Sequence, residues 1–162
     1  MKKYLAVALV LASTQAQAIV FDAYKDLLEK DLSCASYPHT DIKMHLQLLK
    51  ETGAIPNNSV IPKAGRKATA FKAAEGLSVF GFPLLSVMLY PADGQIAPMI
   101  AVTLAAKPKA VASAISARAK AQGAKLQEIQ GSYSGDNEDK GFTLAVMPDK
   151  GGTMLSCSTF QP

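Results

Sequence analysis

The second half of the sequence is a series of short apolar runs separated by turn residues, and this pattern restricts the chain to folds built on a β-sheet. Their length and partial alternation are typical of strands, and Pro, Gly, Asp and Asn between them are typical of tight turns. We predict turns at 91–94, 134–137 and 149–152. Because the turns are short, we expect hairpins and an antiparallel sheet of five or six strands. The predicted strands are 77–81, 84–90, 95–105, 124–133, 141–147 and 153–159.

Three other segments have the spacing of amphipathic helices. They are residues 21–32, a segment with Thr40 as its N-cap and Gly53 as its end, and the Ala-rich residues 108–122. Residues 54–76 lack any period and are predicted to be a long connection. Because the strands at 84–90 and 95–105 are apolar on both faces, we expect the Ala-rich crossover helix on one face and the two N-terminal helices on the other. The predicted fold class is α+β.

The first 18 residues resemble a secretory signal peptide in their order of charge and hydropathy. Lys2 and Lys3 precede an apolar stretch at 4–12, and small residues flank Gln17. Nine apolar residues are too few to span a membrane, which takes about 20. We therefore predict a cleaved signal peptide at 1–18, a single domain at 19–162, no membrane span, and a location in a bacterial periplasm.

Cys34 and Cys157 are the two cysteines of the chain, and an even count in an exported protein favours a disulfide. Chain-entropy models give roughly 4–5 kcal/mol for closing a loop of this length. The chain lacks a Cys-x-x-Cys motif, so we predict a structural bridge between the two ends of the domain and not a redox pair.

The charge balance argues against nucleic acid as a partner. Of 17 basic residues, two lie in the predicted signal peptide, and the remaining 15 face 13 acidic ones. The basic residues are unevenly spread, and one run lies in the predicted connection. Such a run is typical either of a solvated loop or of a surface for an acidic partner. We take it as the candidate partner-binding site, composed of Lys63, Arg66, Lys67 and Lys72.

No pattern of catalytic or cofactor-binding residues is present in the sequence. His39 and His45 are the two candidate imidazole bases, and we expect His45 to be structural, on or beside the apolar face of its helix. Met44 and the two histidines offer ligands of the type copper prefers, but neighbouring helical residues diverge by about 100°. We therefore expect Met44 in the core, and we predict no enzyme, no cofactor and no metal site.

Two functions are the leading hypotheses for a small, exported, disulfide-bonded domain, ahead of an enzyme of unfamiliar type. The first is a protein-binding module, an inhibitor or immunity-type protein that occludes an envelope-acting enzyme or toxin. The second is a carrier of small hydrophobic ligands, with Tyr90 and the strand methionines Met88, Met99, Met147 and Met154 along its pocket. We favour the simpler interpretation of these methionines, that they fill gaps in the core under the N-terminal helices. We take the protein-binding module as the main hypothesis.

Overall fold

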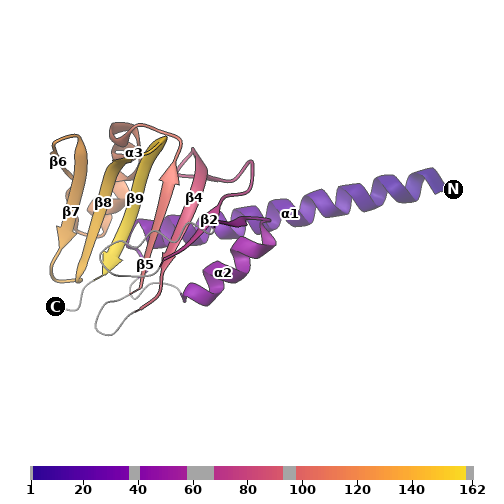
Figure 1. The fold of residues 1–162 in the computed structure, drawn as a ribbon, viewed down its shortest axis with the longest axis horizontal. Helices are drawn as coiled ribbons and strands as arrows, with labels where there is room; N and C mark the ends of the chain where they lie inside the picture. The colour runs from indigo at the N-terminus through magenta and orange to yellow at the C-terminus, as the bar shows by residue number, and fades with distance from the viewer. Residues whose placement is uncertain (1, 37–40, 58–67, 93–97, 160–162) are drawn as a thin grey trace.

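The fold is a large antiparallel sheet with three helices on one side (Figure 1). The computed structural model describes residues 2–36, 41–57, 68–92 and 98–159, and the side chains from Gln17 onward. The helices are α1 (Lys2–Leu32), α2 (Ile42–Glu51) and α3 (Pro108–Ala121). The predicted α+β class is therefore confirmed.

The described residues form nine strands, which is more than the five or six that the sequence predicted. Their order in the sheet is β1-β2-β4-β5-β9-β8-β7-β6, with β3 paired to β4, and all neighbours are antiparallel. The strands are β1 (Ile55–Asn57), β2 (Thr69–Lys72), β3 (Ser78–Val79), β4 (Phe82–Tyr90), β5 (Met99–Leu104), β6 (Gln127–Ile129), β7 (Ser132–Asn137), β8 (Phe142–Asp149) and β9 (Gly152–Thr159).

The additional strands lie where the sequence predicted loops and turns. The connection predicted at 54–76 contains β1 and β2, which pair with each other and join the sheet through β4. The turn predicted at 134–137 is part of β7, and the chain turns into β8 at 138–141. An additional turn at Gln130 and Gly131, both with positive φ, separates β6 from β7. Positive φ at both central residues fits a type I′ hairpin turn, which is usually marked by Asn-Gly. Because Gln130 stands where Asn is usual, the sequence did not predict this hairpin turn.

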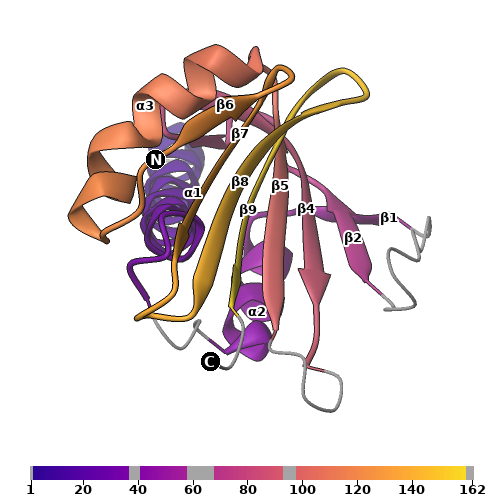
Figure 2. The ribbon, with the colours of Figure 1, turned by 90° about the vertical axis from the view of Figure 1, so that its left-hand side faces the viewer.

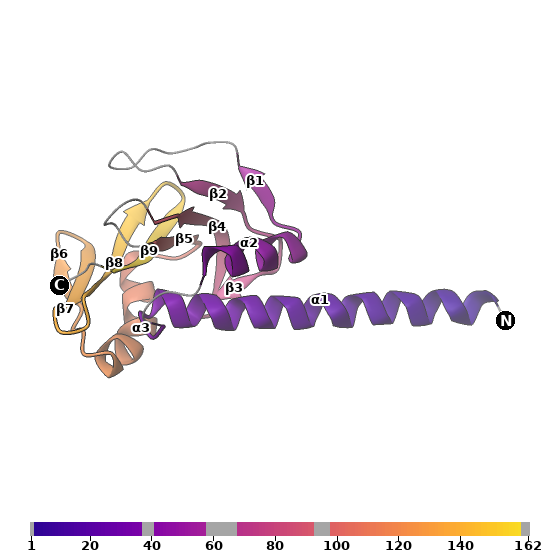
Figure 3. The same ribbon diagram turned by 90° about the horizontal axis from the view of Figure 1, so that it is seen from below.

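All three helices pack on one face of the sheet, contrary to the expectation of one helical layer on each face (Figures 2 and 3). One core cluster joins Leu28 of α1, Leu49 of α2 and Ile115 of α3 to inward side chains of β4, β5, β8 and β9. This main core therefore joins all three helices to one face of the sheet.

The opposite face of the sheet carries a smaller apolar cluster, which contains three of the strand methionines. Met88 and Tyr90 are buried there with three alanines, and Met99 and Met154 pack against them. Met147 lies opposite Met154 in the register and is half-buried. These methionines are packed within the sheet's own second layer of side chains, not under the N-terminal helices as the core alternative assumed.

A β-bulge at the start of β4 reverses the orientation that simple alternation would give to two leucines. Simple alternation places Leu85 inward with Val87, and Leu84 outward. The register shifts between Leu84 and Ser86, so Leu84 is buried in the main core and Leu85 is 39% exposed. A bulge inserts one residue into a strand and so inverts the alternation on one side of it.

The disulfide between Cys34 and Cys157 is confirmed, with the two Cα atoms 5.7 Å apart. Cys34 has a φ of 56° and ends α1 in the left-handed conformation that glycine usually supplies. The amide of Ala35 donates to the carbonyl of Lys30, and that of Cys34 donates to Asp31. The bridge therefore attaches the last turn of α1 to β9 in the middle of the sheet. A disulfide is compatible with an extracellular or periplasmic location.

Candidate functional site: an apolar groove beside α1

An open groove lies where α1 passes the end of α2 and the beginning of β4. Its volume is about 910 Å³. Gln17 of α1 forms one wall, Thr52 and Gly53 after α2 and Ile55 of β1 form another, and residues 72–78 and 83–85 complete it. Four separate parts of the sequence therefore meet at this groove.

The apolar character of the groove comes from both its floor and its rim. Leu77 and Leu84 are buried beneath it, whereas Ile55 is 63% exposed and Leu85 is 39% exposed at its edges. The exposure of Leu85 is a consequence of the bulge in β4, and that of Ile55 reflects its position on the edge strand β1. Large apolar side chains that share one exposed hollow are typical of a binding surface.

Two charged side chains stand at the rim of the groove. Lys72 ends β2 and Glu75 lies in the connection to β3, and both are exposed. Neither forms an ion pair within the part of the chain that the structure describes. Both charges are therefore accessible to a partner at the edge of the apolar floor.

Of the four basic residues predicted to bind a partner, Lys72 lies at this groove. Lys63, Arg66 and Lys67 lie outside the described residues, and their role stays a prediction. Ile55 and Leu85 were missed, because Ile55 fell in a predicted connection and only the bulge exposes Leu85. The isolated Ile between Ala54 and Pro56 was the one available signal for the groove.

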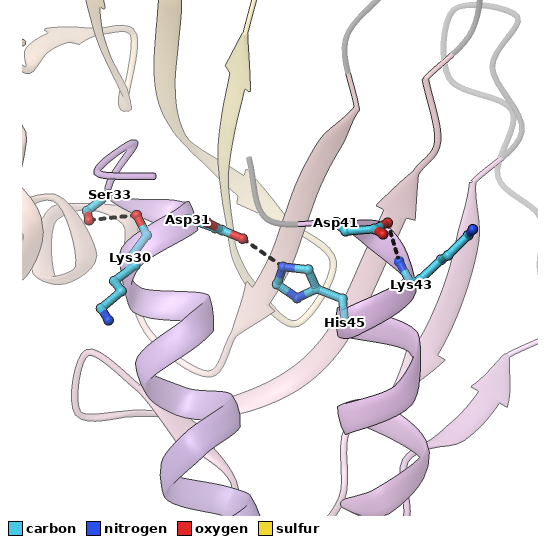
Figure 4. A network of polar contacts seen from close by, with 6 residues as sticks. All are labelled: Lys30, Asp31, Ser33, Asp41, Lys43 and His45. Atoms are coloured by element: carbon cyan, nitrogen blue, oxygen red, sulfur yellow. Dashed lines mark hydrogen bonds and ion pairs between the residues drawn. The ribbon is translucent and has the colours of Figure 1, made fainter. Parts of the chain in front are cut away.

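A buried polar pair connects the C-terminal end of α1 to the first turn of α2 (Figure 4). The Nε2 of His45 lies 2.7 Å from Oδ2 of Asp31, and both side chains are 0% exposed. The ring of Tyr24 meets His45 edge to face at 5.8 Å. His45 is thus a structural residue, as predicted, and it orients α2 on α1.

The chemistry of this pair is limited by its burial. A histidine held by a carboxylate resembles the base and orienter of hydrolases, but Nδ1 of His45 has no hydrogen-bond partner among the described residues. The Tyr24 hydroxyl is likewise buried without a partner. Burial, reinforced by the nearby Asp31 carboxylate, raises the pKa of Tyr24 well above its usual range. The cluster holds two helices together and offers no group to a substrate.

A second polar cluster connects α1, α3 and the turn between β3 and β4. Glu29 accepts hydrogen bonds from the amide of Phe80, at 2.8 Å, and from Nη1 of Arg118, at 2.7 Å. The Arg118 guanidinium lies 4.9 Å from the centroid of the Phe80 ring. Phe80 has a φ of 53°, which is unusual for an aromatic residue. Glu29 and Arg118 therefore stabilise a turn that its own residues disfavour.

Of the metal ligands considered from the sequence, Met44 and His45 diverge as predicted, but the burial predicted for Met44 is wrong. Met44 is 50% exposed and His45 is fully buried, so Met44 is not a core residue. His39 lies outside the described residues. Within the described residues, no three His, Cys, Asp or Glu side chains lie close enough together to hold a metal ion. The helices described here also include none that is long and apolar enough to cross a membrane.

Comparison with protein-family models, with curated protein sequences and with solved structures gives no match.

Proposed function

We propose that this protein is an exported, periplasmic protein-binding module that inhibits or neutralises an envelope-acting enzyme or toxin. The observation that carries the proposal is the apolar groove, with exposed Ile55 and Leu85 beside the accessible charge of Lys72. An apolar anchor with a charged rim is the usual composition of a protein interface. The partner would place an apolar side chain against Leu77 and Leu84, and Lys72 would attract its carboxylates.

Export is supported by the way α1 is attached. Among the described side chains of α1, those that enter the core follow the proposed cleavage site, and Tyr24, Leu28 and Leu32 are fully buried. Gln17, Ala18 and Ile19 are exposed. Figures 1 and 3 show the first half of α1 extending beyond the rest of the molecule. Removal of residues 1–18 would therefore leave the described core contacts of α1 in place.

The alternative function, a carrier of small hydrophobic ligands, is favoured by one feature of the same groove. Its volume of about 910 Å³ is within the range of small-molecule pockets. However, such pockets bury most of the ligand surface, whereas Ile55 and Leu85 lie at an open rim. The open shape suits a protuberance of a protein better than a free lipid.

Site-specific photocrosslinking in the periplasm tests the proposal. We expect a photoreactive residue at position 85 to capture one protein, and the same residue at Ile129, which is 60% exposed on β6, to capture none. The captured protein should be an enzyme that equimolar amounts of this chain inhibit. Binding of a fatty acid that Leu85→Asp abolishes, without any captured enzyme, would support the carrier instead.

A further inference from the structure

A second hollow lies beside α1, next to the groove. Its volume is about 230 Å³, and Ala18, Phe21, Asp22 and Lys25 of α1 line it together with residues 76–78. Residues 76–78 also line the groove. The two hollows therefore share one wall and adjoin at α1, where Gln17 lines the groove and Ala18 lines the second hollow.

We propose that cleavage after Ala18 joins the two hollows into one continuous binding groove around the new end of α1. Gln17 and Ala18, which line the adjoining ends of the two hollows, leave with the signal peptide. Phe21 stays in place, because it packs against Gly76, where an added Cβ would lie 3.8 Å from its Cε2. The proposal rests on the proposed export and protein binding, and it makes the processed chain the form that binds.

The charges around the joined groove indicate the chemistry of its occupant. Cleavage creates an α-ammonium group on Ile19, whose pKa of about 7.7–8.0 keeps it mostly charged at pH 7. Together with Lys25 and Lys72, this group gives the joined groove three positive charges, against the two negative charges of Asp22 and Glu75. None of these four side chains forms an ion pair among the described residues. The occupant is therefore an extended segment of a partner protein, with an apolar side chain for Leu77 and Leu84 next to a carboxylate.

The experiment compares two forms of the whole chain. The processed form is purified from the periplasm, and mass spectrometry should give Ile19 as its first residue. The unprocessed form, residues 1–162, is made by cell-free translation in oxidising buffer, where no signal peptidase acts. A phage library of random linear peptides is selected on the processed form, and the Kd of each enriched peptide is measured for both forms.

We expect the enriched peptides to carry a Leu, Ile or Phe beside Asp or Glu, and to bind the processed form at least tenfold more tightly. Leu85→Asp in the processed form should abolish binding, and the matched control Ile129→Asp should leave it unchanged. Equal Kd values for both forms, enriched peptides without this composition, or no enrichment would each overturn the inference.

These outcomes are separable from the proposed function. If the processed chain inhibits its captured enzyme while peptides bind both forms equally, the function stands and the opening of the groove does not. If the peptides behave as expected and no enzyme is inhibited, the joined groove stands and the inhibitor function does not.

Discussion

The two ends of the described side chains of α1 differ in almost every physical respect. At the C-terminal end, a disulfide, a buried polar pair and three fully buried apolar residues attach the helix to the sheet and to α2. At the Gln17 end, three consecutive residues are exposed and the helix borders two hollows. The helix is thus anchored at one end and forms the edge of a surface at the other.

This difference separates stability from binding within one element. Substitutions at the anchored end remove buried contacts and should lower the free energy of unfolding of the whole domain. Substitutions at the groove change exposed side chains and should leave the fold almost unchanged, because surface changes usually stay within about 0.5 kcal/mol. The following predictions test that contrast.

The largest effect is expected from Asp31→Ala. It leaves His45 fully buried with neither ring nitrogen hydrogen-bonded to a described residue. Removing one partner of a buried pair costs about 3–5 kcal/mol. Urea unfolding of the oxidised protein should show this loss. Asp31→Asn is the control, since its amide oxygen still accepts from the imidazole and should preserve part of the stability; equal losses in the two variants would contradict the role of the pair.

A slightly smaller effect is expected when the disulfide is removed by the double substitution Cys34→Ser and Cys157→Ser. The bridge joins residues 123 positions apart, and removing a native disulfide from a small exported domain typically costs about 2–5 kcal/mol. Unfolding midpoints of the wild-type and double-Ser proteins measure the difference. Intact mass before and after reduction should differ by two protons, and free thiols in periplasmic material would contradict the bridge.

Much of the framework was predictable from local patterns. The end of α1, the strands at 84–90, 141–147 and 153–159, and the Pro108 start of α3 all follow from periodicity and turn chemistry. The missed features depend on contacts distant in sequence. Phe80 keeps its positive φ beside Glu29, which is 51 positions away, and no local propensity predicts such a turn. Asp41, rather than Thr40, is the N-cap of α2, with its side chain accepting from the Lys43 amide.

The candidate site was less predictable than the fold. The run that includes Lys72 directed attention to charge, whereas the groove is defined by apolar residues from four parts of the chain. Leu85 is exposed by a bulge that the regular apolar pattern conceals. The prediction of helices on both faces of the sheet was wrong, because small residues and methionines pack against one another on the outward face. A sheet that is apolar on both faces therefore did not need helices on both.

Tyr24→Phe should produce a smaller effect in the opposite direction. The hydroxyl is buried without a partner, and leaving such a group unsatisfied costs about 1–3 kcal/mol. The Phe variant should therefore be as stable as the wild type or more stable, by about 1 kcal/mol. A clear loss of stability at pH 7 would mean that the hydroxyl is hydrogen-bonded.

The same substitution has a pH signature. The pKa of Tyr24 is raised in the folded protein by burial and by Asp31, so the folded state favours the neutral phenol. The stability that Tyr24 contributes through this preference is fully present below the unfolded-state pKa of about 10. Above that pH the free energy of unfolding falls by about 1.4 kcal/mol per pH unit. Between pH 10 and 11 the wild type should lose stability faster than Tyr24→Phe, and parallel curves would contradict this assignment.

The smallest effect on stability, with the clearest effect on binding, is expected from reversing Arg66 and Lys67 to Glu. Their positive charges belong to the run that ends at Lys72, and a partner with carboxylates would be attracted by them. Association with the captured enzyme should slow at low salt, and the difference should shrink as salt rises, because exposed charges are screened. The melting temperature should barely move.

The matched control reverses Lys109 and Lys120, which are exposed on α3, and should leave the association rate unchanged. If both double variants slow association equally, net charge alone steers the partner. If reversing Arg66 and Lys67 lowers the melting temperature instead, this segment is part of the stabilising structure, and stability would not be confined to the anchored end of α1.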